Sequence, residues 1–288
     1  MPGPGREAAA HLVIQAPDIG TPQIKHLARL TQADTVSALT AAQTQAFRLS
    51  PARNREGVAE FCAEADLDFG FVPADQRLGR VRLLAMDMDS TLIGIECIDE
   101  IADVHGIGPQ VAAITRSSMR GEIDFRESLA RRVALLAGLD VAALERVYAE
   151  RLRLSPGAER MLSGFARAGA KTLLVSGGFT FFTERLKARL GLDYSLASTL
   201  QIVDGRLTGR IEGDIVDAQA KADAFDRLRV ELAGEDTLAV AIGDGANDLP
   251  VLARADISVA YHANPVVRAA ATYAVDRCGL DAILNLFV

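Results

Sequence analysis

Acidic and small polar residues stand at the ends of several short apolar runs in the sequence. Asp87 and Asp89 end the run VRLLAMDMD, and GDGAND (residues 243–248) ends the run TLAVAIGDGAND. A lone Asp-x-Asp is more often a solvated loop pair than a site, although two carboxylates at a turning strand end can take separate roles. In the second segment, Gly243 and Gly245 allow a tight turn, and two acids with an amide are a costly choice for a mere turn.

Two further features suit phosphate chemistry, although each is weak alone. Ser176-Gly177-Gly178 follows the apolar run KTLLV and offers a hydroxyl and unhindered backbone N–H groups, which can cradle an anion. A plain turn is at least as common for such a tripeptide. Lys221 lies in the predicted helix AQAKADAF, where an isolated lysine is normally a surface residue.

The elements that must position these residues form a repeating pattern. Four apolar runs, which begin near residues 81, 171, 237 and 257, are each followed by a helical pattern, and this alternation predicts a parallel sheet covered on both faces. Ligands of such sheets bind at the carboxyl ends of the strands, where every polar cluster above lies. Helical periodicity over residues 96–156 predicts an inserted cap, and TLQIVDGRLTGRIEG predicts a hairpin that turns at Asp204-Gly205.

The N-terminal part of the sequence, residues 1–78, has a different pattern of apolar and polar residues. Residues 1–10 predict a flexible tail, and residues 11–78 predict a small α+β domain of roughly β-α-β-β-α-β order. Two roles stay open for this domain, a docking or dimerising module and a ligand sensor. Residues 79–288 form the remaining domain, which carries the cap.

Composition limits the class of protein. The 288 residues include 31 Lys and Arg against 38 Asp and Glu, a net charge of −7, which excludes a broad basic surface for nucleic acid. The longest uncharged run, Thr35 to Phe47, is too short and polar to span a membrane, and the N-terminus lacks a secretory pattern, so we expect a cytoplasmic protein.

Cys62, Cys97 and Cys278 show no metal or disulfide spacing, and we expect them reduced and buried.

The joint order of the motifs is far more specific than any one of them. The Ser-Gly turn, the lysine and the Gly-Asp cluster follow Asp87 by 89, 134 and 157 residues. This arrangement resembles the haloacid dehalogenase superfamily, which implies an α/β, Rossmann-like core with a parallel sheet and a helical cap after its first strand. The N-terminal domain resembles the ACT ligand-binding fold that accompanies some members.

The resemblance is closest to the phosphoserine phosphatase family, in the strings DMDSTLIGIECIDEIA, GEIDFRESLARRVALL, LLVSGGFTFF and AIGDGANDLPVL. It implies Mg²⁺-dependent hydrolysis of O-phospho-serine to serine and phosphate through an aspartyl-phosphate, the last step of serine biosynthesis. Phosphothreonine and phosphohomoserine are alternative substrates. A decayed core that only binds ligands is the rival from another class, and the intact acid pair argues against it. The oligomeric state is left open, with a homodimer among the options.

The resemblance also implies a role for each site residue. Asp87 is the nucleophile and Asp89 the general acid and base. Mg²⁺ is held by the side chains of Asp87 and Asp244 and the backbone carbonyl of Asp89, with Asp248 supporting the metal site. The substrate is bound by residues of the core and cap: Ser176, Gly177, Lys221 and Asn247 at the phosphoryl oxygens, Glu96 at the amino group, Arg132 at the carboxylate, and Met119 and Phe125 in the lid.

Overall fold

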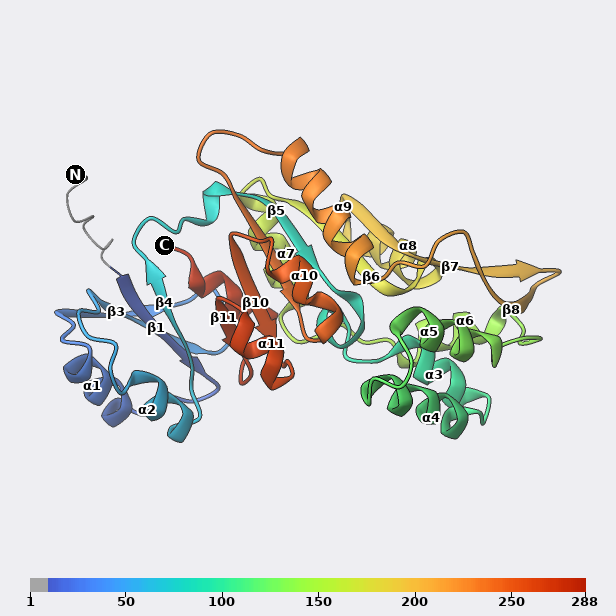
Figure 1. The fold of residues 1–288 in the computed structure, drawn as a ribbon. Helices are drawn as coiled ribbons and strands as arrows, with labels where there is room; N and C mark the ends of the chain where they lie inside the picture. The colour runs from blue at the N-terminus through green and yellow to red at the C-terminus, as the bar shows by residue number, and fades with distance from the viewer. Residues whose placement is uncertain (1–9) are drawn as a thin grey trace.

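A computed structural model describes residues 10–288 of the chain. The predicted tail lies outside the described residues except for Ala10, where the prediction is wrong because Ala10 begins the first strand. An N-terminal sheet, a larger central sheet and a group of helices lie in a row (Figure 1). Within residues 10–288, no helix combines the length and the apolar character that a membrane span requires.

The N-terminal sheet follows the predicted β-α-β-β-α-β order. Its elements are β1 (Ala10–Ala16), α1 (Thr21–Leu30), β2 (Thr35–Leu39), β3 (Gln45–Ser50), α2 (Val58–Glu64) and β4 (Asp68–Pro73). The strands pair in the order β2-β3-β1-β4, all antiparallel. Leu12 and Ile14 of β1 face Leu27 of α1 and Val58 of α2 in a separate small core.

The central sheet has seven strands, all parallel except for the last pair. They are β5 (Val81–Met86), β6 (Lys171–Phe179), β7 (Tyr194–Val203), β8 (Arg206–Glu212), β9 (Leu238–Gly243), β10 (Ile257–Tyr261) and β11 (Tyr273–Val275). Their order across the sheet is β11-β10-β9-β5-β6-β7-β8. The predicted parallel sheet is therefore confirmed, and β9, β5 and β6, which carry the polar motifs, are neighbours.

Helices cover both faces of this sheet, which explains its continuous apolar strands. The helices of the core are α7 (Ala158–Arg167), α8 (Thr180–Leu190), α9 (Ala218–Glu231), α10 (Leu249–Leu252), α11 (Pro265–Ala270) and the 3₁₀ segment η5 (Leu280–Leu286). Leu84 and Met86 of β5 share one core with Phe165 of α7, whereas Leu83 and Ala85 share another with Phe225 of α9. Alternate residues of β5 thus point to opposite helical layers.

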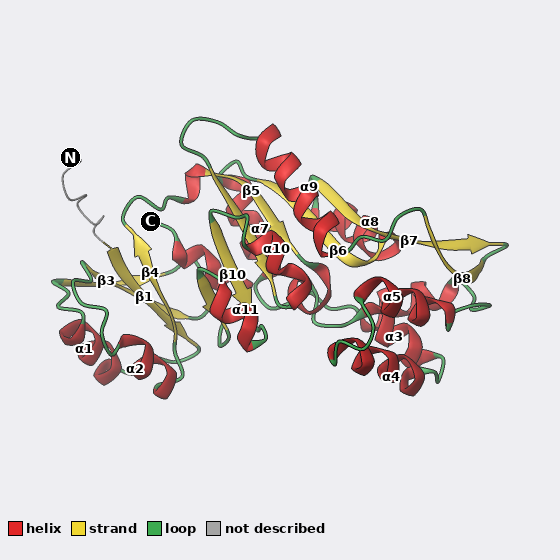
Figure 2. Ribbon diagram, in the orientation of Figure 1, coloured by secondary structure: helices red, strands yellow, loops and turns green. Residues whose placement is uncertain are grey.

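The long connection between β5 and β6 forms the predicted helical cap. Its helices are α3 (Cys97–Val104), α4 (Gly108–Met119), α5 (Phe125–Ala134), α6 (Ala142–Arg146) and the helical turn η3 (Val147–Arg151). They gather at the end of the molecule opposite the N-terminal sheet (Figure 2). The β7–β8 hairpin turns at Asp204-Gly205 as predicted and packs on the cap, where Leu207 exchanges backbone hydrogen bonds of 2.8 Å with the chain at Gly138 and Leu139.

Candidate active site

The site forms where β9, β5 and β6 end. Asp87 directly follows β5, Asp244 directly follows β9, and Ser176 lies in the second half of β6. Lys221 enters from the first turn of α9, a helix whose N-terminus is capped by Asp217. The convergence of these residues follows from the sheet order, since adjacent parallel strands present their carboxyl ends at one edge.

A buried chain of charges links two of these motifs. The Lys221 ammonium lies 3.0 Å from Asp87 Oδ1 and 2.8 Å from Asp248 Oδ1, and Lys221 is only 1% exposed. Burial and the charge of Asp248 raise the pKa of Asp87 well above its usual range, against the attraction of Lys221. Burial works against the charge of Lys221, but the two carboxylates outweigh it and raise the lysine pKa. Lys221 is therefore a buried cation paired with two carboxylates, whereas its local sequence suggests a surface lysine.

Asp89 lies in a tight turn between the core and the cap. Its Oδ1 accepts the backbone N–H of Cys97 at 3.1 Å, at the start of α3, and the turn places Ser90 at φ +56°. Burial and the nearby charge of Glu96 raise the pKa of Asp89 to about 7. A side chain at Gly178 would approach Asp89 Oδ2 to 2.8 Å, so glycine keeps room for this carboxyl. A carboxyl with this pKa can both give and accept a proton near neutral pH.

One carboxylate oxygen from each of Asp87, Asp244 and Asp248 lies within 4.8 Å of the other two. Asp248 Oδ2 accepts the N–H groups of Asp244 and Gly245, at 3.1 Å each, while its Oδ1 faces Lys221. Both oxygens of Asp248 are therefore engaged, one with the loop and one with Lys221. Asp244 receives a 2.7 Å hydrogen bond from the Thr91 hydroxyl, and burial raises its pKa to about 6. The remaining carboxylate oxygens of Asp87 and Asp244 suit a hard divalent cation.

The anion cradle at the end of β6 is also formed. The Ser176 hydroxyl accepts the N–H of Gly178 at 2.9 Å, which fixes the turn. A side chain at Gly177 would come within 2.8 Å of the Phe125 ring, so this cap residue lies directly over the cradle. Asn247 approaches from the loop after β9, with Nδ2 at 3.5 Å from Asp87 Oδ2. Met119, which the resemblance places in the lid, lies at the end of α4 and is 80% exposed.

Two charged residues of the cap face this centre. Glu96 accepts a 2.7 Å hydrogen bond from the Ser90 hydroxyl, and burial raises its pKa. Arg132 of α5 is largely buried, which lowers its pKa against the attraction of Asp99 and Glu96. Among residues 10–288 no carboxylate lies within ion-pair distance of Arg132, so its guanidinium is free to meet an incoming anion.

Sequence reasoning missed the supporting residues around these groups. Thr91 and Ser90 hold Asp244 and Glu96 through their hydroxyls. Both follow the acid pair in the segment DMDSTL (residues 87–92). Hydroxyl residues directly after two acids could have indicated that they support the site. The backbone N–H of Cys97 carries no sequence signal at all.

Comparison with known proteins agrees with this geometry. Residues 84–253 match the model of the haloacid dehalogenase-like hydrolases, and residues 12–58 match a domain of unknown function. A phosphoserine phosphatase of Polaromonas sp. is 51% identical over 217 residues, which cover 74% of this chain and 92% of that protein.

Solved structures extend the similarity to the N-terminal sheet. A HAD family hydrolase from Salmonella enterica serovar Typhi has a TM-score of 0.87 at 32% identity and covers 96% of this chain and 98% of its own. A probable phosphoserine phosphatase from Vibrio cholerae has a TM-score of 0.80 at 35% identity, with 96% and 86% covered. The fold and site thus define a haloacid dehalogenase-like hydrolase. Within that class, the chain belongs to the phosphoserine phosphatase family.

Proposed function

We propose that this protein is a Mg²⁺-dependent phosphoserine phosphatase that hydrolyses O-phospho-serine to serine and phosphate, the final step of serine biosynthesis. The observation that carries the proposal is the close approach of Asp87, Lys221 and Asp248 beneath a cap that presents Glu96 and Arg132. The first three suit phosphoryl transfer, and the last two suit the ammonium and carboxylate of an amino acid.

The first half-reaction moves the phosphoryl group to Asp87. A carboxylate oxygen of Asp87 attacks phosphorus, and the bond from phosphorus to the serine oxygen breaks as Asp89 donates a proton to that oxygen. Serine leaves neutral at the hydroxyl, and Asp87 carries the phosphoryl group. Because Lys221 contacts Asp87 directly, its charge lies where negative charge builds up on the phosphoryl oxygens.

The second half-reaction restores the enzyme. Asp89, now a carboxylate, takes a proton from a water molecule that attacks phosphorus, and the bond between phosphorus and Asp87 breaks to release phosphate. Ser176, the N–H of Gly177 and Asn247 hold the phosphoryl oxygens throughout. Phe125, which lies against Gly177, excludes bulk water from the first step.

Mg²⁺ would be held by the side chains of Asp87 and Asp244 and the backbone carbonyl of Asp89, with Asp248 supporting the loop. When bound, it supplies positive charge that offsets the repulsion between the carboxylates and a dianionic phosphate. The three buried cysteines, all free, are consistent with action in the reducing cytoplasm. We further propose that residues 11–78 form one domain and residues 79–288 the catalytic domain with its cap.

Proton competition predicts a pH-dependent affinity for Mg²⁺. Because burial raises the pKa of Asp244 to about 6, this carboxyl takes up a proton as the pH falls through 6 and must lose it to bind the ion. We expect Mg²⁺ affinity to fall about tenfold or more from pH 7 to pH 5. Calorimetric titration at several pH values measures this directly.

Thr91→Val provides the control for this effect. The Thr91 hydroxyl lowers the Asp244 pKa, so its removal moves the whole profile to higher pH. An affinity that stays constant between pH 5 and pH 7 contradicts the assignment of Asp244 as a ligand.

Substrate choice is the decisive test of the proposed function. Phosphate release is measured with Mg²⁺ for phosphoserine, phosphothreonine, phosphohomoserine and phenyl phosphate, on wild type and on Arg132→Ala. We expect phosphoserine to be among the best substrates, and Arg132→Ala to lower its kcat/KM about 100-fold because a charged hydrogen-bond partner of the carboxylate is lost. Phenyl phosphate has no carboxylate, so its turnover changes little in the variant.

Arg131→Ala is the matched control, since Arg131 is exposed and pairs with Glu127 on the same helix. If phosphoserine ranks low, the substrate assignment is wrong. An equal loss for phosphoserine and phenyl phosphate instead removes Arg132 from carboxylate recognition.

A further inference from the structure

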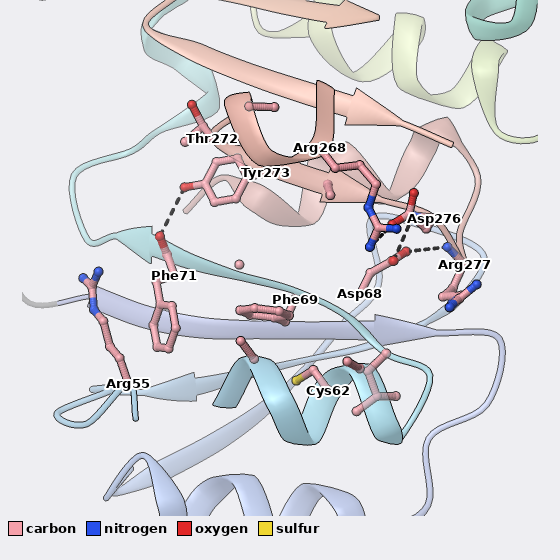
Figure 3. A pocket seen from close by; sticks show the side chains of 16 residues that line it. Arg55, Cys62, Asp68, Phe69, Phe71, Arg268, Thr272, Tyr273, Asp276 and Arg277 are labelled. Carbon is pink, nitrogen blue, oxygen red and sulfur yellow. Dashed lines mark hydrogen bonds and ion pairs between the residues drawn. The ribbon is translucent and has the colours of Figure 1, made fainter. Parts of the chain in front are cut away.

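A cavity lies between the N-terminal sheet and the end of the central sheet, away from the proposed active site. It measures about 600 Å³, and it is lined by α2, β4, α11 and the chain around β11 (Figure 3). None of the proposed catalytic or substrate-binding residues lines it. Its volume is within the range of small-molecule sites.

Hydrogen bonds fix both ends of this cleft. At one end the Tyr273 hydroxyl donates to the backbone oxygen of Phe71 at 3.3 Å. At the other, the Asp68 carboxylate accepts the N–H groups of Asp276 and Arg277 at 2.9 Å each, and that of Cys278 at 3.2 Å. The two walls are therefore held at a set spacing, and the cleft is formed before any ligand arrives.

The floor of the cleft is aromatic. Phe69 and Phe71 are half-buried on β4, with ring centres 6.2 Å apart at an angle of 84°. Small side chains also line the cleft, among them Ala59 and Ala63 of α2 and Ala271 after α11. Aromatic rings in a cleft that small residues also line leave room for a flat apolar body.

Cations line the cleft in excess, although the chain is acidic overall. Arg268 pairs with Asp276 at 2.9 Å and Arg277 with Asp66 at 2.7 Å. Arg55 differs from both: its guanidinium lies 4.8 Å from the ring centre of Phe71, and it has no acidic partner among residues 10–288. Figure 3 shows Arg55 at the Phe71 end and the other two arginines at the far end.

The acidic groups of the cleft are already engaged. Asp68 accepts three backbone N–H groups, and Asp276 is paired with Arg268. An incoming anion therefore finds a free cation at Arg55, whereas an ammonium finds no free carboxylate. The cleft is thus complementary to an anion and not to a zwitterionic amino acid.

We propose that this cleft binds a small organic anion with a flat aromatic body, with the rings of Phe69 and Phe71 against the body and Arg55 at the anionic group. Free serine does not fit this chemistry, because it lacks the apolar body and carries an ammonium. The site is therefore distinct from the serine and phosphate chemistry of the catalytic centre.

Backbone hydrogen bonds connect one wall of the cleft to the proposed active site. Arg268 lies on α11, and its backbone N–H donates to the Asn264 carbonyl at 3.0 Å. The Asn264 N–H in turn donates to the backbone oxygen of Asp244 at 3.3 Å. A ligand that contacts Arg268 is thus one helical turn from the proposed metal ligand, and we infer that the bound anion alters turnover. This second part rests on the proposed function.

Fluorescence titration of the full-length protein with 8-anilinonaphthalene-1-sulfonate tests the site. We expect one bound probe per chain, at least about tenfold weaker binding for Arg55→Glu, and loss of binding for Ala59→Trp, which fills the cleft from an exposed helix position. Arg29→Glu makes the same charge change on the exposed face of α1 and is expected to bind like wild type. The uncharged analogue N-phenyl-1-naphthylamine is expected to bind more weakly than the sulfonate.

Equal affinity of Arg55→Glu and Arg29→Glu, or displacement of the probe by inorganic phosphate with Mg²⁺, overturns the site. Turnover of phosphoserine is the second measurement, and we expect saturating probe to change kcat/KM at least about twofold in wild type but not in Arg55→Glu. Unchanged wild-type turnover overturns the effector role. Because probe binding is measured without substrate, a failure of the proposed phosphatase activity leaves the binding result readable on its own.

Discussion

The Asp87→Asn protein is expected to release phosphate from phosphoserine at least about 10⁴-fold more slowly than wild type. An amide is a poor nucleophile, and the change removes the group that forms the covalent intermediate while keeping the side-chain shape. Phosphate release at saturating phosphoserine and Mg²⁺ gives the rate. Asp103→Asn, on the exposed end of the cap helix α3, is the control and is expected to retain wild-type turnover.

Stability separates this loss from simple unfolding. Burial and the charge of Asp248 raise the pKa of Asp87, so the folded state binds its proton more tightly than the unfolded chain does. Above that pKa, the ionised carboxylate therefore makes the folded state less stable, and a neutral asparagine removes this effect. We expect the melting temperature of Asp87→Asn at pH 8 to equal or exceed that of wild type. Near-normal turnover contradicts the assignment of Asp87 as the nucleophile. A melting temperature many degrees lower contradicts the inference that the buried charge of Asp87 destabilises the folded state.

The central sheet and its site could be predicted because burial leaves a strong trace in the sequence. The strands β5 and β9 are covered on both faces, so each is a continuous apolar run that ends abruptly at Asp87 or Asp244. The order of the motifs then placed Lys221 in the site, although its local sequence suggests an ordinary surface residue. Only the fold shows why Lys221 is charged and buried, since both of its partners come from other elements.

The features that escaped prediction depend on contacts between distant segments. The predicted order includes the strand β2, but its position in the sequence was not predicted, because β2 is exposed along most of its length at the sheet edge and shows no apolar alternation. The aromatic cleft depends on Asp68 meeting the chain more than 200 residues later. Met119 lies in a segment that resembles a lid and is exposed, so its place over the substrate stays a prediction. The pattern of neighbouring residues in the sequence does not show which distant segments come into contact.

In the proposed mechanism Asp89 acts first as general acid and then as general base. The resemblance implied a carboxyl that must be protonated in one step and ionised in the next, which requires a pKa above the ordinary value of about 3.9. The fold supplies the cause, because burial beneath the cap and the charge of Glu96 raise it to about 7. Glu96 thus raises the pKa of Asp89 and, in the proposed mechanism, also binds the substrate, so the proposal gives the cap a part in the chemistry as well as in recognition.

Lys221→Met is expected to lower both turnover and stability, and the two losses have different causes. Methionine fills the same space without charge, so Asp87 and Asp248 lose the cation that lies between them. Breaking a buried ion pair from one side costs about 3–5 kcal/mol of unfolding free energy. Turnover is expected to fall at least about 10³-fold, because a positive charge on the phosphoryl oxygens is lost. Urea unfolding and phosphate release measure the two effects.

The double variant Lys221→Met/Asp248→Asn distinguishes the two causes. Removing one of the facing carboxylates relieves their repulsion, so part of the lost stability is expected to return while turnover stays low. Lys171→Met is the control, since Lys171 forms a half-exposed pair with Asp193 at 2.7 Å and its loss is expected to cost less than about 1 kcal/mol. Because Lys221 lowers the pKa of Asp87, its removal raises that pKa further, and the stability deficit shrinks as the pH falls and the carboxyl is protonated. Equal destabilisation by Lys221→Met and Lys171→Met, or a deficit that grows in acid, shows that Lys221 does not hold the two carboxylates together.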